Sequence, residues 1–329
     1  MSKVTELLSA LLNDEQIEDF TPTSRMESYL KNCCLASGSE GLPNPISRAD
    51  ALLYSLAEKI AGGGSGGGGS ASTEWFNDGN THLWISLSEG RTSPILGVCV
   101  NGTATVDWGD GTTPDVLTGY FTTGNAVWTP VHDYAKPGDY VITVTVDGTM
   151  GIVGDVLSDT GTRFLRHSSG ADVRNYAYMS AIKRVEVGKN VVDIGTRGFY
   201  NCYGLSAVKI QSEQVGIGYY SFAYCYAMQT LILPDGVTFT NGNTFDSCKS
   251  LPSMVIPASV TKLDGYTFAR CSGLKFLDFT KHTSVPTLSS AYAFDYTPDD
   301  LEILVPAALH DEWIAATNWS AQASKIKAV

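Results

Sequence analysis

Four cysteines spaced 23 residues apart constrain the fold of this chain more than any other feature. Each lies three residues after a phenylalanine and three before a leucine or methionine. A fixed period of about 20 to 50 residues is typical of stacked units that bury their apolar side chains only against their neighbours. The sequence therefore predicts a stack of repeats. The four frames contain Phe199, Cys202 and Leu205; Phe222, Cys225 and Met228; Phe245, Cys248 and Leu251; and Phe268, Cys271 and Leu274.

The pattern also predicts the local structure of each repeat. Two apolar residues at spacing two follow each frame, as at Val208 and Ile210, which indicates a short strand with one face inward. The part with apolar residues at every third position predicts a tight turn or a 3₁₀-like segment. One further copy precedes the four frames, with Tyr176 and Met179, and one follows with Phe294 and three additional residues.

One copy resembles a known repeat family. It reads Ile-Pro-Ala-Ser-Val-Thr-Lys-Leu-Asp-Gly-Tyr-Thr-Phe-Ala-Arg-Cys-Ser-Gly-Leu and ends at Leu274, and it resembles the BspA-type leucine-rich repeat of bacterial surface proteins. The segment from Leu304 to Ser320 is similar to the C-terminal helical cap of that family. The resemblance implies a β-rich leucine-rich-repeat solenoid over residues 151–305, with an N-terminal cap, and a helical cap over residues 306–329. In that cap Leu309, Trp313 and Ile314 would cover the last repeat.

The repeat cysteines are expected to be buried free thiols. Ladder neighbours would lie one repeat apart along the stack, and an unpaired cysteine is usually a small buried apolar residue. A zinc site needs converging ligands, and this spacing contains no paired Cys-x-x-Cys motif. The other three of the seven cysteines, Cys33, Cys34 and Cys99, carry no motif.

Residues 1–61 are predicted to form a helical anchoring or docking module. Apolar residues recur there at helical spacing in three segments, whose faces are expected to need a partner because three short helices form a thin core. A small autonomous helical domain is the alternative. Residues 62–72 are a flexible Gly/Ser linker by composition, either natural or engineered. The predicted anchoring residues are Leu7, Leu8, Leu11, Leu12, Met26, Tyr29, Leu30, Leu52, Leu53 and Leu56.

Residues 73–150 alternate between apolar and polar side chains, as strands do. The segment Val-Asp-Trp-Gly-Asp-Gly-Thr ends at Thr112, and it is followed by His132-Asp-Tyr134 and by Pro137-Gly-Asp-Tyr-Val-Ile-Thr-Val144. These motifs resemble the polycystic-kidney-disease-type (PKD) immunoglobulin-like domain. The resemblance implies a β-sandwich that serves as a spacer or as a module contacting proteins or glycans. The predicted fold is thus multidomain: a short α-helical module, a linker, a β-sandwich, the repeats and the helical cap.

Asp107 and Asp110 of this motif have two interpretations. They could be a calcium pair or an acid/base pair, or their carboxylates could accept hydrogen bonds from amides of the turn. We favour the structural role, because Asp side chains in turns commonly bond the backbone two residues on.

Composition excludes several classes of partner. The 329 residues carry a formal net charge of −12, whereas binding to nucleic acid or to an anionic membrane depends on Lys and Arg. No apolar run is long enough to span a bilayer. The N-terminus lacks the basic and apolar segments of a signal peptide, so none is expected.

The sequence predicts no enzymatic activity. Its five histidines are scattered and belong to no metal-binding or catalytic motif, and a nucleophile would need a base and an orienting group nearby. No catalytic residue, metal ligand or cofactor is therefore predicted.

Residues that vary between repeats are the candidates for partner binding. Tyrosine with Ser, Gly and Asn is the composition of adaptable binding surfaces, although these tyrosines could instead only pack on neighbouring turns. The outward stripe of the strands is predicted as Glu186, Lys209, Ile232, Val255 and Asp278, apolar in the middle with a charged rim. The candidates are Tyr200, Tyr203, Tyr219, Tyr220, Tyr224, Tyr226, Ile232, Val255, Tyr266 and Arg270.

Two functions follow from these features. Residues 21–30 and 45–53 resemble anchoring segments of tail and head fibres in phages of Firmicutes. The first hypothesis is therefore a non-enzymatic virion appendage, expected to be a homo-oligomer such as a trimer. It would be attached by residues 1–61 and would bind a host-surface glycan or protein through residues 73–329. The alternative is a bacterial cell-surface adhesin of the BspA-like class.

Overall fold

The computed structural model describes residues 74–90, 92–119, 131–152, 165–167, 180–239 and 242–329. The chain divides into two compact units, Met1–Trp75 and Phe76–Val329. The predicted helical module and linker, residues 1–72, lie outside the described residues, so the fold below is that of the second unit.

The first part of this unit is an antiparallel β-structure. Strand β1 (Thr81–Leu87) pairs with β5 (Gly138–Ile152), which pairs in turn with β3 (Val98–Asp107). Strand β4 (Asp115–Gly119) pairs with β3, and β2 (Pro94–Leu96) pairs with β6 (Leu165–His167) in a separate ladder. Both faces of β1 are buried, with Leu83, Ile85 and Leu87 on one face and His82 and Trp84 on the other.

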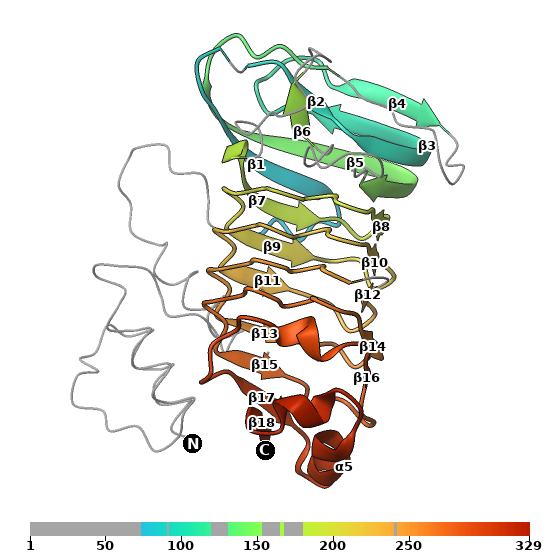
Figure 1. Ribbon diagram of the computed structural model, residues 1–329. Coiled ribbons are helices and arrows are strands. Elements are labelled where there is room, and N and C mark those ends of the chain that lie inside the picture. The colour runs from blue at the N-terminus through green and yellow to red at the C-terminus, as the bar shows by residue number, and fades with distance from the viewer. Residues whose placement is uncertain (1–73, 91, 120–130, 153–164, 168–179, 240–241) are drawn as a thin grey trace, which may run out of the picture. The chain divides into compact units, whose positions relative to one another are not determined.

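The repeats contribute one strand each to two successive parallel ladders, visible as stacked arrows in Figure 1. Ala207 lies opposite Thr230, one 23-residue period later, and Phe276 lies opposite Glu302, so the predicted insertion of three residues before the last strand is confirmed. The strands are β7 (Ile182–Val187), β9 (Ala207–Ile210), β11 (Thr230–Ile232), β13 (Ser253–Val255), β15 (Phe276–Asp278) and β17 (Glu302–Val305).

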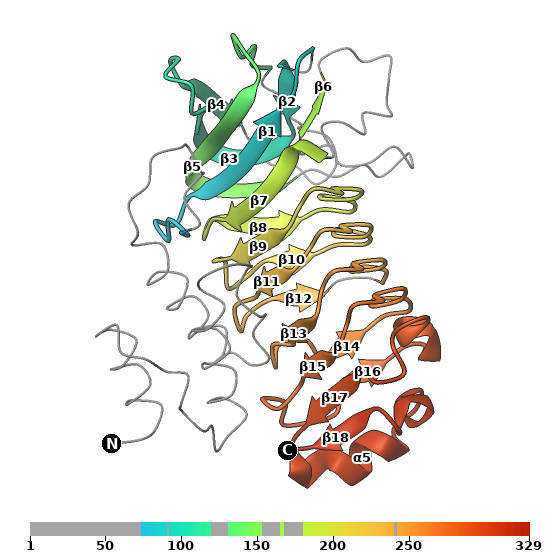
Figure 2. The same ribbon diagram turned by 90° about the vertical axis from the view of Figure 1, so that its left-hand side faces the viewer.

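A second series of short strands follows the other edge of the repeats, as Figures 1 and 2 show. Parallel pairing joins β8, β10 and β12, and it also joins β14 and β16. These strands are β8 (Val191–Ile194), β10 (Gly216–Ile217), β12 (Thr238–Phe239), β14 (Lys262–Leu263) and β16 (Thr287–Leu288).

The antiparallel β-structure and the repeats share one sheet. Strand β1 pairs with β7 of the first repeat, and β5 pairs with β8. Both edges of the first repeat are therefore hydrogen-bonded to the preceding region, which prevents them from offering an unpaired strand to other chains. The sequence assigned this capping to residues 151–180, most of which lie outside the described residues. The predicted sandwich and domain boundaries stay predictions.

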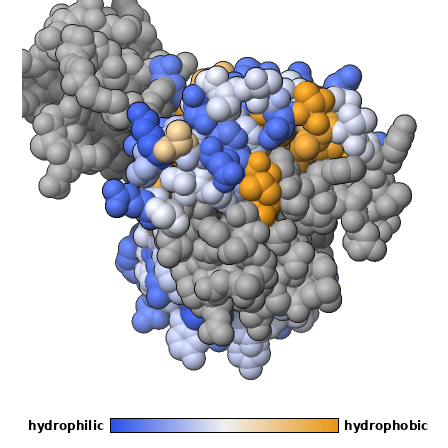
Figure 3. Space-filling model, turned by 90° about the horizontal axis from the view of Figure 1, so that it is seen from above, coloured by the Kyte–Doolittle hydropathy of each residue, from blue (hydrophilic) through white to orange (hydrophobic). Residues whose placement is uncertain are grey.

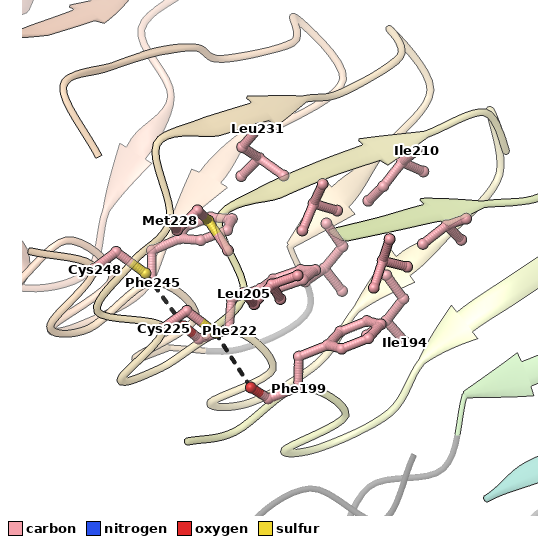
Figure 4. Packing of buried hydrophobic residues seen from close by; sticks show 14 of the residues in the cluster. Ile194, Phe199, Leu205, Ile210, Phe222, Cys225, Met228, Leu231, Phe245 and Cys248 are labelled. Atoms are coloured by element: carbon pink, nitrogen blue, oxygen red, sulfur yellow. Dashed lines mark hydrogen bonds between the residues drawn. The ribbon is translucent and has the colours of Figure 1, made fainter. Parts of the chain in front are cut away.

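Phenylalanine and cysteine form the centre of the stack. Successive rings of Phe199, Phe222, Phe245, Phe268 and Phe294 are nearly parallel, with centroids 5.1, 5.7, 5.5 and 6.0 Å apart. The thiols of Cys225, Cys248 and Cys271 each donate to a phenylalanine carbonyl of the previous repeat. Cys225 Sγ lies 3.3 Å from the oxygen of Phe199, and Cys248 Sγ lies 3.2 Å from that of Phe222 (Figure 4). All five described cysteines are buried and free, which confirms the prediction for the ladder.

The turn around each phenylalanine has a left-handed residue on either side. Positive φ angles occur two residues before the ring and two residues after it, although no glycine occupies these positions. A side chain in this conformation costs about 1–2 kcal/mol, so the packing of the stack must maintain it. The residues are Arg197, Tyr220, Asn243 and Tyr266 before the ring, and Asn201, Tyr224, Ser247, Arg270 and Tyr296 after it.

The C-terminal end is closed by two tryptophans and one strand. Trp313 and Trp319 are buried beside Phe279, and Leu309 and Ile314 pack against the same core. The sequence did not predict the final strand, which extends the parallel sheet by pairing with β17. The elements are η1 (Ala291–Phe294), η2 (Ala307–Leu309), α5 (His310–Ala315), η3 (Trp319–Gln322) and β18 (Ile326–Ala328).

The surface of the described residues is largely polar. Viewed from the end formed by the antiparallel strands, hydrophilic side chains predominate and apolar ones gather in small patches (Figure 3). No helix among the described residues is long and apolar enough to cross a membrane.

Candidate functional site

Six of the predicted binding residues lie together on two neighbouring turns. The turn between β8 and β9 carries two of them, and the turn between β10 and β11 carries four. We call this group the tyrosine face; it consists of Tyr200, Tyr203, Tyr219, Tyr220, Tyr224 and Tyr226. It arises because the repeat places residues of equal position side by side, one turn above the next.

The rings of the tyrosine face pack against one another. Tyr200 meets the edges of Tyr220 and Tyr224, with centroids 5.8 and 5.4 Å apart, and Tyr203 stacks on Tyr226 at 5.2 Å. Tyr219 packs edge-on against Tyr220 at 4.2 Å. Such pairs stabilise the fold by about 0.5–1.5 kcal/mol each beyond the effect of the area they bury, so the rings hold one another in place.

The tyrosine face is accessible to a partner. Tyr219 is 38% exposed and Tyr226 is 37% exposed, whereas Tyr200, Tyr203, Tyr220 and Tyr224 are half-buried. Burial, with a hydrogen bond to Tyr219, raises the pKa of Tyr220, and burial followed by the charge of Asp246 raises the pKa of Tyr224. Both hydroxyls therefore stay protonated at neutral pH and can donate hydrogen bonds.

Two cations lie over the rings. The Arg197 guanidinium is 5.5 Å from the ring centroid of Tyr200 and 5.7 Å from that of Tyr220. The Lys249 ammonium, on the next turn, is 4.6 Å from the ring centroid of Tyr226. Cations within about 6 Å of a ring are attracted by its negative face. Neither cation was among the predicted binding residues, although both occupy variable positions of the repeat.

Arg270 is both a binding candidate and a structural residue. Its guanidinium forms a bidentate ion pair with Asp246, whose side chain is fully buried. A hydrogen bond between Arg270 and Tyr224 lowers the pKa of the tyrosine, against the larger effect of burial. Arg270 therefore neutralises a buried carboxylate and borders the tyrosine face.

The remaining candidates lie elsewhere. Tyr266, 38% exposed, stacks on Tyr292 with centroids 5.7 Å apart, further along the repeats. Ile232 and Val255 are half-buried residues of β11 and β13, so they belong to the sheet rather than to the turns. The structure therefore divides the predicted set between two surfaces.

The predicted charged rim of the sheet stripe is wrong, because both of its acidic residues are buried. Glu186 is fully buried, and its carboxylate accepts hydrogen bonds from the backbone amides of Phe76 and Asn77 at 2.8 and 3.0 Å. Asp278 is also buried and bonds the amide of Thr280 at 2.8 Å. The row itself is in register as predicted, since Glu186 lies opposite Lys209 and Lys209 lies opposite Ile232.

Glu186 fastens a segment that we call the N-terminal strap, residues 76–80. Besides the two amides, the Gln211 side chain donates to Glu186 at 2.6 Å, and the Lys209 ammonium lies 3.8 Å away. The Phe76 ring stacks on His82 with centroids 4.1 Å apart. The strap was not predicted, because it joins residues about 110 positions apart that share no local motif.

The Asp-Gly turn has the structural geometry that the sequence favoured. Asp107 accepts from the amide of Gly109 at 2.9 Å, and Asp110 accepts from the amide of Thr112 at 3.1 Å. The Asp110 carboxylate also lies 2.8 Å from His132 Nε2. Burial raises the pKa of Asp110, but the hydrogen bonds with Thr112 and His132 outweigh burial and lower this pKa to about 2. Among the described residues, no cluster of three or more His, Cys, Asp or Glu could hold a metal ion.

The predicted anchoring residues, from Leu7 to Leu56, lie outside the described residues. Their role stays a prediction.

The repeats match a known family. Residues 172–299 match, in six copies, the family model described as BspA type Leucine rich repeat region. The repeats are of the BspA type. This confirms the resemblance seen in the sequence, including the first copy, which contains Tyr176. The match does not extend to residues 73–150.

Solved structures of leucine-rich repeat proteins are similar over part of the chain. One, from Bacteroides ovatus, is 22% identical and covers 45% of this chain and 37% of its own, with a TM-score of 0.35. The T. pallidum leucine rich repeat protein is 25% identical over 38% of this chain and 60% of its own, with a TM-score of 0.34. A leucine rich cell surface protein from Faecalibacterium prausnitzii is 23% identical over 37% of this chain and 31% of its own, with a TM-score of 0.31.

The chain thus spans less than two thirds of the length of each of these proteins. No curated protein matches it.

Proposed function

We propose that this chain is a non-enzymatic adhesion protein of the bacterial cell surface, and that it binds its partner through the tyrosine face. The observation that carries the proposal is the group of six tyrosines on two adjacent turns, with Arg197 and Lys249 over their rings. Tyrosine and arginine are enriched at binding surfaces, and tyrosine offers a large contact area with few rotors. The BspA type of the repeats supports a surface role.

The alternative of a phage virion appendage receives no support from the family match. It depends on residues 1–61, which lie outside the described residues. Attachment to a particle and oligomerisation through that segment stay predictions. The PKD-type resemblance of residues 73–150 fits a spacer, and the pairing of β1 with β7 would make such a spacer rigid towards the repeats.

Flow cytometry with the labelled full chain tests the proposal. We expect binding to at least one member of a panel of epithelial cells and gut bacteria, and a loss of about tenfold or more when Tyr203 and Tyr226 are both replaced by alanine. Equal binding by this variant would place the contact elsewhere. Absence of binding by the unchanged chain to every cell type would refute an adhesive role.

A further inference from the structure

We infer that the tyrosine face binds an acidic polysaccharide, a linear glycan whose sugars carry carboxylates. The inference rests on the proposed function, because it names the partner of the same surface. Three properties of the surface carry it: its charge, its lack of aliphatic side chains and its periodic order.

Charge is the first property. The chain as a whole has a formal net charge of −12, yet two cations lie over the rings of the tyrosine face, Arg197 and Lys249. The charge of Arg270, at the border of the face, is balanced by the carboxylate of Asp246. Asp246, whose charge contributes to the raised pKa of Tyr220 and Tyr224, is fully buried and paired with Arg270. A locally positive surface on an acidic protein selects an anionic partner.

The kind of apolar surface is the second property. Among the described residues of the repeats, the exposed large apolar side chains of the turns are all tyrosines. A protein partner usually inserts aliphatic or aromatic anchors into an apolar pocket, and no exposed leucine, isoleucine or methionine is found beside these rings. Tyrosine offers a flat ring face for the C–H face of a sugar and a hydroxyl for its hydroxyls.

Periodic order is the third property. Equivalent turns follow one another at a constant spacing of 23 residues, joined by backbone bonds such as Phe199 N to Ser221 O at 2.7 Å and Phe222 N to Thr244 O at 2.9 Å. Tyr203, Tyr226 and Lys249 hold the same position in three consecutive repeats. A row of equivalent groups matches a polymer whose own groups recur at regular intervals, and several weak contacts then act together.

The test compares three kinds of polymer on the full chain by calorimetry or biolayer interferometry. The acidic glycans are polygalacturonate, alginate, hyaluronan and polysialic acid; dextran is the neutral glycan; and poly-L-glutamate is the acidic peptide. We expect one or more acidic glycans to bind at least tenfold more tightly than dextran and poly-L-glutamate, with an affinity that falls as salt rises. Equal binding of poly-L-glutamate, or no binding of any acidic glycan, would overturn the inference.

Two variants separate the contribution of charge from that of the rings. Replacing Arg197 and Lys249 by glutamine should weaken glycan binding about tenfold or more and flatten its salt dependence, while Tyr203→Ala with Tyr226→Ala should weaken it at every salt concentration. Matched controls are Lys275→Gln, which removes a cation paired with Asp300 outside the face, and Tyr296→Ala, at the position equivalent to Tyr224. Loss of binding in either control to the same extent would contradict the assignment.

The outcome also separates this inference from the proposed function. If the tyrosine variant loses cell binding but the unchanged chain binds no acidic glycan, adhesion stands and the glycan is excluded. If the unchanged chain binds neither cells nor glycans, both the adhesive function and the glycan inference are refuted.

Discussion

The buried ladder and the tyrosine face occupy the same turns but follow opposite rules. The positions of Phe199 and Cys202 hold Phe and Cys in four consecutive repeats, and both residues have no solvent exposure, while their neighbours Tyr200 and Tyr203 change from copy to copy. The buried positions set the spacing of the stack, because the rings pack on one another and the thiols of Cys225, Cys248 and Cys271 bond the previous turn. The exposed positions are free to vary, so specificity can be placed there without altering the fold.

The largest effect should come from removing a ring of the buried ladder. Phe222 is stacked between Phe199 and Phe245, at 5.1 and 5.7 Å. Phe222→Ala leaves a cavity in the middle of the stack, and we expect it to lower the free energy of unfolding by about 3–5 kcal/mol. Urea titration followed by circular dichroism measures this. A loss as small as that of the control Tyr296→Ala would contradict the importance of the ladder.

Removing the carboxylate under the N-terminal strap should rank second. Glu186→Ala leaves the amides of Phe76 and Asn77 and the side chain of Gln211 without their acceptor. We expect a loss of about 2–3 kcal/mol, and hydrogen exchange that accelerates at those two amides more than at the amides of β1. Unchanged exchange at Phe76 would show that the strap is held by other contacts. Glu89→Ala, which removes an exposed carboxylate just after β1, is the control.

Alkaline pH should lower the stability of the buried ladder. Burial raises the pKa of the Cys225 and Cys248 thiols well above the ordinary 9.0, and it raises that of Cys271 to about 12. The folded state therefore keeps these thiols protonated, whereas the unfolded state releases their protons above pH 9. Stability is complete below pH 9 and falls above it, by at most about 1.4 kcal/mol per pH unit for each thiol.

Urea titrations at pH 8, 9 and 10 measure this slope. Cys248→Ala should reduce the slope of stability against pH by the contribution of one thiol. A stability that rises between pH 9 and 10 would contradict buried, protonated cysteines.

The smallest effect concerns the left-handed turn positions. Tyr296 has φ 57° and is 76% exposed, so its side chain contributes little packing to offset the conformational cost. Tyr296→Gly should raise the free energy of unfolding by about 0.5–1 kcal/mol relative to Tyr296→Ala, because glycine adopts this conformation without strain. A glycine variant less stable than the alanine variant would show that the turn gains nothing from relief of strain.

The sequence predicted what repeats and missed what does not. Phe199, Cys202 and Leu205 share a fixed spacing, so the strand, the turn and the buried thiols could be derived from one frame. The contact between Phe76 and Glu186 spans 110 residues with no repeating signal, and therefore no local rule pointed to it. In the same way, Glu186 was predicted at the exposed rim because alternation along a strand does not show what covers each face.

The tyrosine face was predicted in part. Its six tyrosines were recognised as variable positions, and the stack brought them together because equivalent positions lie one above another. The cations Arg197 and Lys249 were missed, since their ring partners lie on the same turn or the next one and the spacing alone does not show which side chains meet.

One measurement tests the separation of the two regions most directly: melting temperature and cell binding of Tyr203→Ala with Tyr226→Ala beside those of Cys225→Ser. The tyrosine variant should melt within a few degrees of the unchanged chain and lose about tenfold or more in binding. The cysteine variant should melt at a clearly lower temperature, because a hydroxyl replaces a buried thiol, and bind normally while folded. Loss of binding in the folded cysteine variant, with normal binding of the tyrosine variant, would contradict the account.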